Sequence, residues 1–382
     1  MRSNWFSRYV LPGLILKAAI IGGGYLSGRE LIQYFASSGP LGGLSGMAIA
    51  MLIWSCVYAA TLEFARMHRS YDYRTFFRNL LGPFWVLFEV AYLITILTVL
   101  SVLTSVAGTT LATVTGWPVL LCECAFMASV AGVLFFGTQS VERFLSLWSF
   151  VLYPAFAALV VLSFWKFGDR IAERVHSMPV PDLGNVAWNG LKYAAYNIAA
   201  MAAVLFCARH IQTRKDALIG GLLGGPLAMA PGMLFFLSMS AFDPQIRTQA
   251  VPVEYLLARL DLPVFRLIFL AIMAVTLIGT CSALIHAVNE RVAQTLTFTH
   301  RQLPGWGRAA IAAATMILSV FVAVNIGLVA LVDRGYGFIA WLFIGVFMIP
   351  VMTYGIWKIV RGHRMAVSTP AMDSADGVTS RQ

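Results

Sequence analysis

The stretch Leu16-Lys-Ala-Ala-Ile-Ile-Gly-Gly-Gly-Tyr-Leu-Ser-Gly-Arg-Glu-Leu-Ile-Gln33 decides the fold. It is apolar on both sides of three consecutive glycines, Gly22, Gly23 and Gly24, and a fourth glycine, Gly28, follows closely. Each glycine weakens a helix by about 1 kcal/mol relative to alanine, so the run of three favours an opening of the helix. Unpaired backbone groups are tolerated at membrane depth only where they are buried in protein or line a wet cavity. A broken first membrane span therefore predicts a binding site.

The composition is that of an integral membrane protein. The chain has 382 residues, of which 59% are hydrophobic and 12% charged, and its mean hydropathy is +0.78. Soluble domains carry about a quarter charged residues. Apolar stretches of about 20 residues, the length that crosses a bilayer, recur along nearly the whole chain. The sequence thus predicts an all-α polytopic membrane protein with about ten transmembrane helices.

The apolar spans fall into two sets of five, separated by a polar link. We expect spans at about residues 10–37, 41–65, 84–113, 118–137, 144–166, 188–208, 217–241, 264–290, 308–330 and 335–358. The polar segment between spans 7 and 8 contains 253–260, which we expect to be a short surface helix. The predicted regions are a cytoplasmic N-terminus, a first five-helix repeat, an extracytoplasmic link, a second five-helix repeat and a disordered cytoplasmic tail, at 1–9, 10–166, 167–187, 188–360 and 361–382.

The placement of Lys and Arg predicts the orientation. They concentrate in the loops after spans 2, 4, 6 and 8, for example at Arg66, Arg69, Arg209, Arg214 and Arg301. Cytoplasmic loops are rich in Lys and Arg, so both termini are expected on the cytoplasmic side of a bacterial inner membrane. This placement explains the net charge of +10 without nucleic acid, which we do not expect as a partner.

A second flaw lies in the sixth span, where Asn197 interrupts an apolar run and Tyr193 and Tyr196 flank it. Interrupted segments in corresponding positions of two inverted repeats indicate the substrate site of a transporter. The alternative is that the glycines merely allow close helix packing. We assign to substrate binding the residues Gly22, Gly23, Gly24, Ser27, Gly28, Arg29, Glu30, Tyr92, Tyr193, Tyr196 and Asn197.

Several charged residues lie within or beside the spans. Charges inside a membrane are costly and usually functional, so Arg29 is a candidate for an outer gate or a substrate anion, and Glu30 for a proton or a cationic group. Alternatively, both side chains reach the outer interface and are solvated there. Lys17 either replaces a coupling cation or pairs with Glu89, which lies at similar depth. Glu123 is expected to be an interface charge.

Four motifs resemble a known family, and the likeness covers about residues 10–360. They are Gly22-Gly-Gly-Tyr-Leu-Ser-Gly-Arg-Glu-Leu31, Tyr193-Ala-Ala-Tyr-Asn197, Arg214-Lys-Asp-Ala-Leu-Ile-Gly-Gly221 and His286-Ala-Val-Asn-Glu-Arg291. The chain resembles the YkvI-type bacterial membrane proteins, which are similar to the LeuT-like amino acid–polyamine–cation transporter superfamily. The resemblance implies a LeuT-like 5+5 inverted repeat with discontinuous helices 1 and 6. In the first motif this chain has Tyr25-Leu26 in place of the usual Phe-Ala, and Arg29 in place of Gln.

The resemblance also implies a place for a coupling cation. Sodium-coupled members of the superfamily hold the ion between span 1 carbonyls and hydroxyls of span 8, where this chain has Thr276 and Thr280. Thiols are poor ligands for a hard cation, and Cys281 stands where a second hydroxyl would be wanted. Threonine hydroxyls in membrane helices also commonly bond their own backbone, which is the alternative role for this pair.

The expected function is secondary active transport of a small polar solute, such as an amino acid or a related zwitterion or amine, by alternating access. The expected partners are this solute, membrane lipid, and sodium ions or protons as alternative coupling ions. A sensor or receptor that kept the fold without transporting is the alternative. The sequence has no His-Glu-x-x-His, nucleophile elbow or Walker loop, so we predict no enzyme activity, cofactor or metal. It assigns no oligomeric state.

Overall fold

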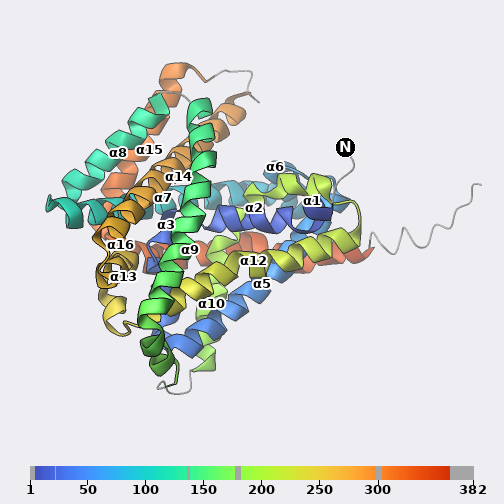
Figure 1. Ribbon diagram of the computed structural model, residues 1–382. Helices are drawn as coiled ribbons and strands as arrows, with labels where there is room; N and C mark the ends of the chain where they lie inside the picture. Colours follow the sequence, from blue (N-terminus) through green and yellow to red (C-terminus); the bar gives the residue numbers. More distant parts are fainter. Residues whose placement is uncertain (1–4, 22, 136–137, 177–181, 298–302, 362–382) are drawn as a thin grey trace, which may run out of the picture.

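The computed structural model describes residues 5–21, 23–135, 138–176, 182–297 and 303–361, and every regular element in these ranges is a helix (Figure 1). The elements up to the end of the fifth span are α1 (Trp5–Tyr9), α2 (Leu11–Ile20), α3 (Gly23–Leu26), α4 (Arg29–Phe35), η1 (Ala36–Ser38), α5 (Gly39–Met67), α6 (Tyr73–Leu81), η2 (Gly82–Phe84), α7 (Trp85–Thr115), α8 (Val119–Phe135) and α9 (Thr138–His176).

The elements of the second half begin after the polar link. They are α10 (Leu183–Asn197), α11 (Ala199–Ala203), η3 (Leu205–His210), α12 (Arg214–Ser240), η4 (Gln245–Thr248), α13 (Pro252–Leu260), α14 (Pro263–Thr297), α15 (Gly305–Ile326), α16 (Leu328–Ala330), η5 (Leu331–Gly335), α17 (Tyr336–Phe343), η6 (Ile344–Met348) and η7 (Val351–Gly355).

The predicted fold class, an all-α polytopic membrane protein, is confirmed. Seven helical stretches in the described chain are long and apolar enough to cross a membrane, and they cover the predicted spans 2, 3, 5, 7, 8, 9 and 10. The three other predicted spans are the shorter α8 and two interrupted segments, α2 to α4 and α10 to η3. Spans 1 and 6 are therefore the discontinuous ones, as expected.

The helices form two packed groups, which are seen on different sides of Figure 1. In one group α5 and α12 lie side by side, with α2 on α12 and α10 on α5. In the other group α7 packs on α8 and α15, and α14 contacts all three. A Cβ on Gly221 would lie 2.3 Å from the Ala59 Cα, and one on Gly225 would lie 2.4 Å from the Met51 carbonyl oxygen. Small residues of this kind let membrane helices approach closely.

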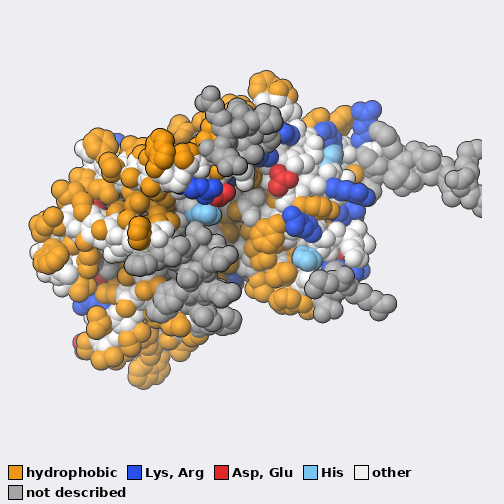
Figure 2. Space-filling model, turned by 90° about the horizontal axis from the view of Figure 1, so that it is seen from above, with side chains coloured by type: hydrophobic (Ala, Val, Ile, Leu, Met, Phe, Trp, Pro, Cys, Tyr) orange, Lys and Arg blue, Asp and Glu red, His pale blue; other side chains and the backbone are white. Residues whose placement is uncertain are grey.

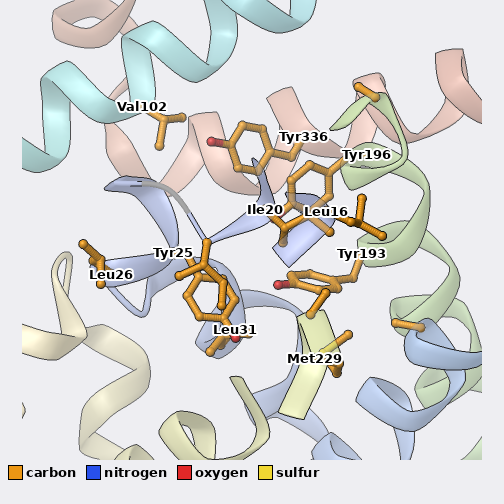
Figure 3. Packing of buried hydrophobic residues seen from close by; sticks show 14 of the residues in the cluster. Leu16, Ile20, Tyr25, Leu26, Leu31, Val102, Tyr193, Tyr196, Met229 and Tyr336 are labelled. Carbon is orange, nitrogen blue, oxygen red and sulfur yellow. The ribbon is translucent and has the colours of Figure 1, made fainter. Parts of the chain in front are cut away.

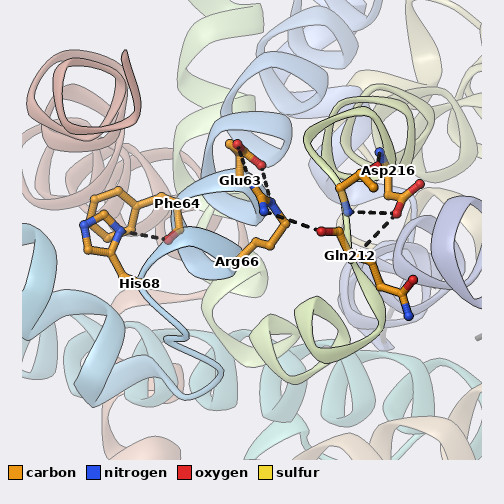
Figure 4. A network of polar contacts seen from close by, with 7 residues as sticks. Glu63, Phe64, Arg66, His68, Gln212 and Asp216 are labelled. Carbon is orange, nitrogen blue, oxygen red and sulfur yellow. Dashed lines mark hydrogen bonds and ion pairs between the residues drawn. The ribbon is translucent and has the colours of Figure 1, made fainter. Parts of the chain in front are cut away.

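One end of the molecule is basic, and hydrogen bonds there connect and cap the helix ends. Figure 2 shows Lys and Arg side chains gathered over the end at which α1 and α6 lie. Figure 4 shows Arg66 between the Glu63 carboxylate, at 2.7 Å, and the Gln212 carbonyl oxygen, at 3.5 Å. The helix α12 begins there with a capping box, in which Thr213 and Asp216 satisfy each other's backbone N–H groups. These bonds join the end of α5 to the start of α12.

The segment 253–260 is helical, as predicted, and it lies at the surface with one face exposed, at Ala258 and Arg259, and the other face buried. In α13 the side chains of Val253, Leu256, Leu257 and Leu260 are buried, and the helix packs against α4, α9 and α14. The sequence shows an amphipathic segment, whose apolar face needs a cover. Part of that cover is the next helix, α14, and part comes from α4 and α9, which lie far away in the sequence and which the pattern itself does not reveal.

Candidate substrate site at two helix breaks

The first span is broken twice. α2 ends at Ile20 and α3 begins at Gly23, so two glycines, Gly23 and Gly24, open the short middle helix. Gly22 lies outside the described residues. At Gly28, the residue before α4, φ is 74°, a left-handed conformation that favours glycine. A Cβ at Gly28 would also lie 2.6 Å from the Met239 sulfur. The glycines therefore shape the break, as the sequence predicts.

The sixth span is broken at the predicted residue. α10 ends at Asn197, whose Nδ2 donates to the Tyr193 carbonyl oxygen at 3.1 Å, and the chain continues as the short α11 and the tighter η3. Just before the break, the Trp54 indole N–H donates to the Ala194 carbonyl oxygen at 3.0 Å. This bond anchors the end of α10 to α5.

A buried carboxylate connects the two breaks. Glu30, in the first turn of α4, is 7% exposed, and it accepts a hydrogen bond from the hydroxyl of Tyr196, which is 5% exposed. Tyr336 of α17 is a second interaction partner of the same carboxylate. Figure 3 shows the rings of Tyr193 and Tyr196 on α10, and of Tyr336 on α17, gathered around the broken first span. Of the predicted site residues, the structure thus brings Glu30 and Tyr196 together.

Four rings, which we call the tyrosine cluster, surround this carboxylate: Tyr34, Tyr193, Tyr196 and Tyr336. Tyr196 is stacked between Tyr336, at a centroid distance of 4.6 Å, and Tyr34, at 5.7 Å. Tyr193 meets Tyr196 edge-on at 5.5 Å. In the described part of the chain, the buried hydroxyls of Tyr34 and Tyr193 have no hydrogen-bond partner. The cluster therefore offers ring faces, free hydroxyls and one carboxylate.

Arg29 lies on the other side of α4, in what we call the Arg29 network. Its Nη1 donates to the carbonyl oxygens of Arg247 and Gln249, both at 3.0 Å, and its Nη2 donates to the Gln33 side chain. Gln33 in turn donates from Nε2 to the Asp333 carboxylate at 3.0 Å. The network ties the first span to η4 and the residue that follows it, and to η5. Protein acceptors thus hold the Arg29 guanidinium on both of its Nη atoms.

The start of α13 lies directly on the first break. The Ser27 carbonyl oxygen accepts a hydrogen bond from the Val253 N–H at 3.0 Å, and the Ser27 hydroxyl accepts one from the Arg29 N–H at 3.2 Å. The start of α13 is thus fixed to the backbone of the broken span. The carbonyl that the break frees from helical bonding is satisfied by another element, as burial requires.

Three other predicted site residues lie elsewhere. Glu89 forms an ion pair with Arg291 at 2.9 Å, and the Arg291 guanidinium lies 4.1 Å from the ring centroids of both Tyr92 and Tyr73. These four residues form what we call the Arg291 cluster. Tyr92 therefore packs in the Arg291 cluster and not in the tyrosine cluster. Lys17 lies over the Tyr153 ring at 4.5 Å, so the Lys17–Glu89 pair does not form. Lys17 and Glu89 were expected to pair because they lie at similar depth, but their side chains point to different neighbours.

The two threonines of α14 bond their own helix. Thr276 Oγ1 donates to the Ile272 carbonyl oxygen at 2.8 Å, and Thr280 Oγ1 donates to that of Thr276 at 2.9 Å. This is the alternative role that the sequence left open. α14 packs against α3, the middle piece of the broken span. A hydroxyl that donates to its own helix still carries lone pairs on its oxygen.

Sequence reasoning missed three residues of this site. Tyr34 follows Glu30 by one helical turn, so the i,i+4 spacing on α4 was a signal for it. Tyr336 and Asp333 reach the first span only because the last span packs on α4 and α10. No spacing within the sequence reports that contact.

The chain is similar to known proteins in structure alone. No protein-family model and no curated protein matches the chain. Crystal structures of a manganese transporter from Eremococcus coleocola align with it. The alignment with a histidine-to-alanine variant of that transporter spans 91% of this chain and 78% of the transporter chain, with a TM-score of 0.57 at 16% sequence identity. A complex with an aromatic bis-isothiourea substituted compound gives 0.55 at 16% identity, over 89% and 77%. The chain has a transporter fold.

Proposed function

We propose that this protein is a secondary active transporter of a small polar solute that carries an ammonium group, such as an amino acid or an amine. The observation that carries the proposal is the buried Glu30 carboxylate, which lies between two helix breaks and is bonded by Tyr196. Breaks in corresponding spans mark the substrate sites of many transporters. The resemblance to YkvI-type proteins, and through them to the LeuT-like superfamily, supports the same function and a 5+5 inverted repeat.

The chemistry of the tyrosine cluster selects the ammonium group. A cation over a tyrosine face is attracted by the ring quadrupole, and Glu30 supplies the opposite charge. The free hydroxyls of Tyr34 and Tyr193 are suited to the polar remainder of a solute. Gly23 and Gly24 supply backbone groups at the same place, which suits a carboxylate of a zwitterion.

Alternating access uses the Arg29 network as a gate. With the N-terminus in the cytoplasm, as the basic end of the chain favours, this network lies on the extracytoplasmic side of the site. Its hydrogen bonds join the first span to η4 and η5. Breaking these hydrogen bonds opens the extracytoplasmic side of the site. The Arg291 cluster lies on the opposite side, at the cytoplasmic end of α7 and α14. The location is the bacterial inner membrane, with both termini cytoplasmic.

Coupling uses either a proton on Glu30 or a cation between α3 and Thr280. The packing of α14 on α3 supports the second arrangement, with Thr276 and Thr280 as oxygen ligands. Sodium-dependent thermal stabilisation of the wild type that is lost in Thr280→Ala supports a cation. Absence of a sodium effect in both proteins removes the cation and leaves the proton.

A thermal-stabilisation screen tests the site. Purified protein is heated with amino acids, amines, organic acids and Mn²⁺, the ion in the name of the structural neighbours. We expect an amino acid or amine to raise the melting temperature of the wild type, and Glu30→Gln to abolish the rise. A rise with organic acids or Mn²⁺ alone, unchanged in Glu30→Gln, contradicts the proposed substrate class.

A further inference from the structure

A cavity lies between α7, α8 and the chain from the end of α15 to η5. Its volume is about 630 Å³, and most of its wall is aliphatic. Its polar and charged lining residues are Ser105, Thr109, Glu123, Asp333 and Arg334. We call it the Glu123 cavity. Ligand sites in proteins commonly have such a volume and an apolar wall with a few polar groups.

Glu123 is the buried acid of this cavity, and its burial corrects the prediction of an interface charge. The side chain is 1% exposed, and in the described part of the chain its Oε2 has no hydrogen-bond partner. Ser105 is a hydrogen-bonding neighbour of the carboxyl group. A Cβ on Gly108 would lie 2.2 Å from the Glu123 Cγ. α7 thus has a glycine where it accommodates the glutamate.

Glu123 has no ion-pair partner among the described residues, so a bound cation could pair with it. None of the ion pairs between described residues includes Glu123. Two carboxylates, Glu123 and Asp333, line the cavity with one guanidinium, that of Arg334. Asp333 and Arg334 are both exposed, so Glu123 is the buried charge among them. A buried carboxylate without an opposite charge to pair with is costly, and a charge within a membrane protein indicates function by default. A bound cation removes this cost.

We propose that the Glu123 cavity binds a small organic ammonium ion, whose amine contacts Glu123 and whose hydrocarbon part packs on the aliphatic wall. The site is separate from the one at the helix breaks, and ligand binding there does not depend on transport. Asp333 belongs to both the cavity and the Arg29 network, because it accepts the bond from Gln33. A cation in the cavity therefore competes for Asp333 and loosens the hold of the network on the first span.

The test uses a photoreactive butylammonium ion, with the full-length protein in lipid nanodiscs. After irradiation, the labelled peptides are identified by mass spectrometry. We expect labelling of peptides from α8 and from residues 323–334 that butylammonium competes away and 1-butanol does not. Because Glu123→Gln removes the charge that the ammonium group would contact, it is expected to lower the labelling about tenfold or more.

Controls separate this site from the general apolar surface and from the transport site. Glu290→Gln changes a half-exposed carboxylate that pairs with Arg308, and it is expected to keep the labelling. Glu30→Gln is also expected to keep it, so this proposal and the proposed function fail separately. Asp333→Asn is the second variant, and we expect it to weaken the labelling without loss of folding. Equal labelling in Glu123→Gln and Asp333→Asn, or equal competition by 1-butanol, overturns the proposal.

Discussion

The hydroxyl of Tyr196 donates a hydrogen bond to the carboxylate of Glu30, across 166 positions of sequence. Each residue belongs to a different broken span, so this bond joins the two halves of the chain at the proposed site. A hydrogen bond to a charged group contributes about 1.5–3 kcal/mol. We therefore expect Tyr196→Phe to weaken binding of the stabilising solute about tenfold or more, as measured by titration of the melting temperature.

Tyr34→Phe is the control for the effect of Tyr196→Phe on stability. The Tyr34 ring stacks on that of Tyr196, but in the described structure its hydroxyl has no hydrogen-bond partner. Tyr34→Phe keeps the ring stack and removes no bond between protein groups, so we expect it to fold as stably as the wild type. If Tyr196→Phe binds the solute as well as the wild type does, the bond has no part in recognition.

The Arg29 network is predicted to limit access to the first break. Lysine lacks the planar fork of arginine and cannot bridge the carbonyl oxygens of Arg247 and Gln249 while also bonding Gln33. In a background without the five natural cysteines, a cysteine replaces Ser27, which is 1% exposed. We expect Arg29→Lys to raise the rate at which a membrane-impermeant thiol reagent labels it about tenfold.

The control for the gate is Arg259→Lys. Arg259 is exposed on the nearby α13, where it donates a hydrogen bond to the Tyr255 hydroxyl of the same helix, at 2.8 Å. We expect it to leave the labelling rate unchanged. Equal rates in Arg29→Lys and in the parent protein count against a gate.

Gly232 is predicted to be essential for the placement of Tyr25. A Cβ on Gly232 would lie 1.8 Å from the Tyr25 hydroxyl oxygen. Overpacking of this kind costs about 1–3 kcal/mol, so Gly232→Ala is expected to lower the melting temperature. Tyr25→Phe in the same chain removes the closest atom and should restore part of the loss. Gly337→Ala, with no atom within 4 Å of the added Cβ, is the matched control and should be neutral.

The Arg291 cluster is predicted to be a structural clamp. The side chains of Arg291 and Glu89 are 11% and 16% exposed. Breaking a buried pair by removing one partner costs about 3–5 kcal/mol, so we expect this loss of unfolding free energy in Arg291→Ala. The double variant with Glu89→Gln should lose less than the sum of the single variants. The exposed pair Arg308–Glu290, at 42% and 38%, should give less than about 1 kcal/mol in the same double-mutant cycle.

The sequence predicted what depends on local chemistry. The breaks at Gly23 and Asn197 follow from helix propensity and appear where they were expected. The spans themselves follow from hydropathy, but their ends do not all match: α9 runs to His176, although its span was predicted to end at 166. The site partners were harder, because they depend on how helices face one another. Tyr336 reaches Glu30 from the last span, and Tyr92 packs under Arg291 instead. The neighbours of a helix determine which of its faces points toward the site. In a helix that is apolar on every side, the sequence pattern does not show which face that is.

Flux through the proposed site is measured most directly in proteoliposomes. Labelled amino acids and amines that stabilise the protein are added outside, with an imposed sodium or proton gradient. We predict accumulation that depends on the gradient in the wild type, and none in Glu30→Gln or Gly23→Leu, provided that both variants keep the wild-type melting temperature without solute. Stabilisation by a solute with no accumulation in the wild type, under either gradient, would contradict transport and indicate a sensor instead.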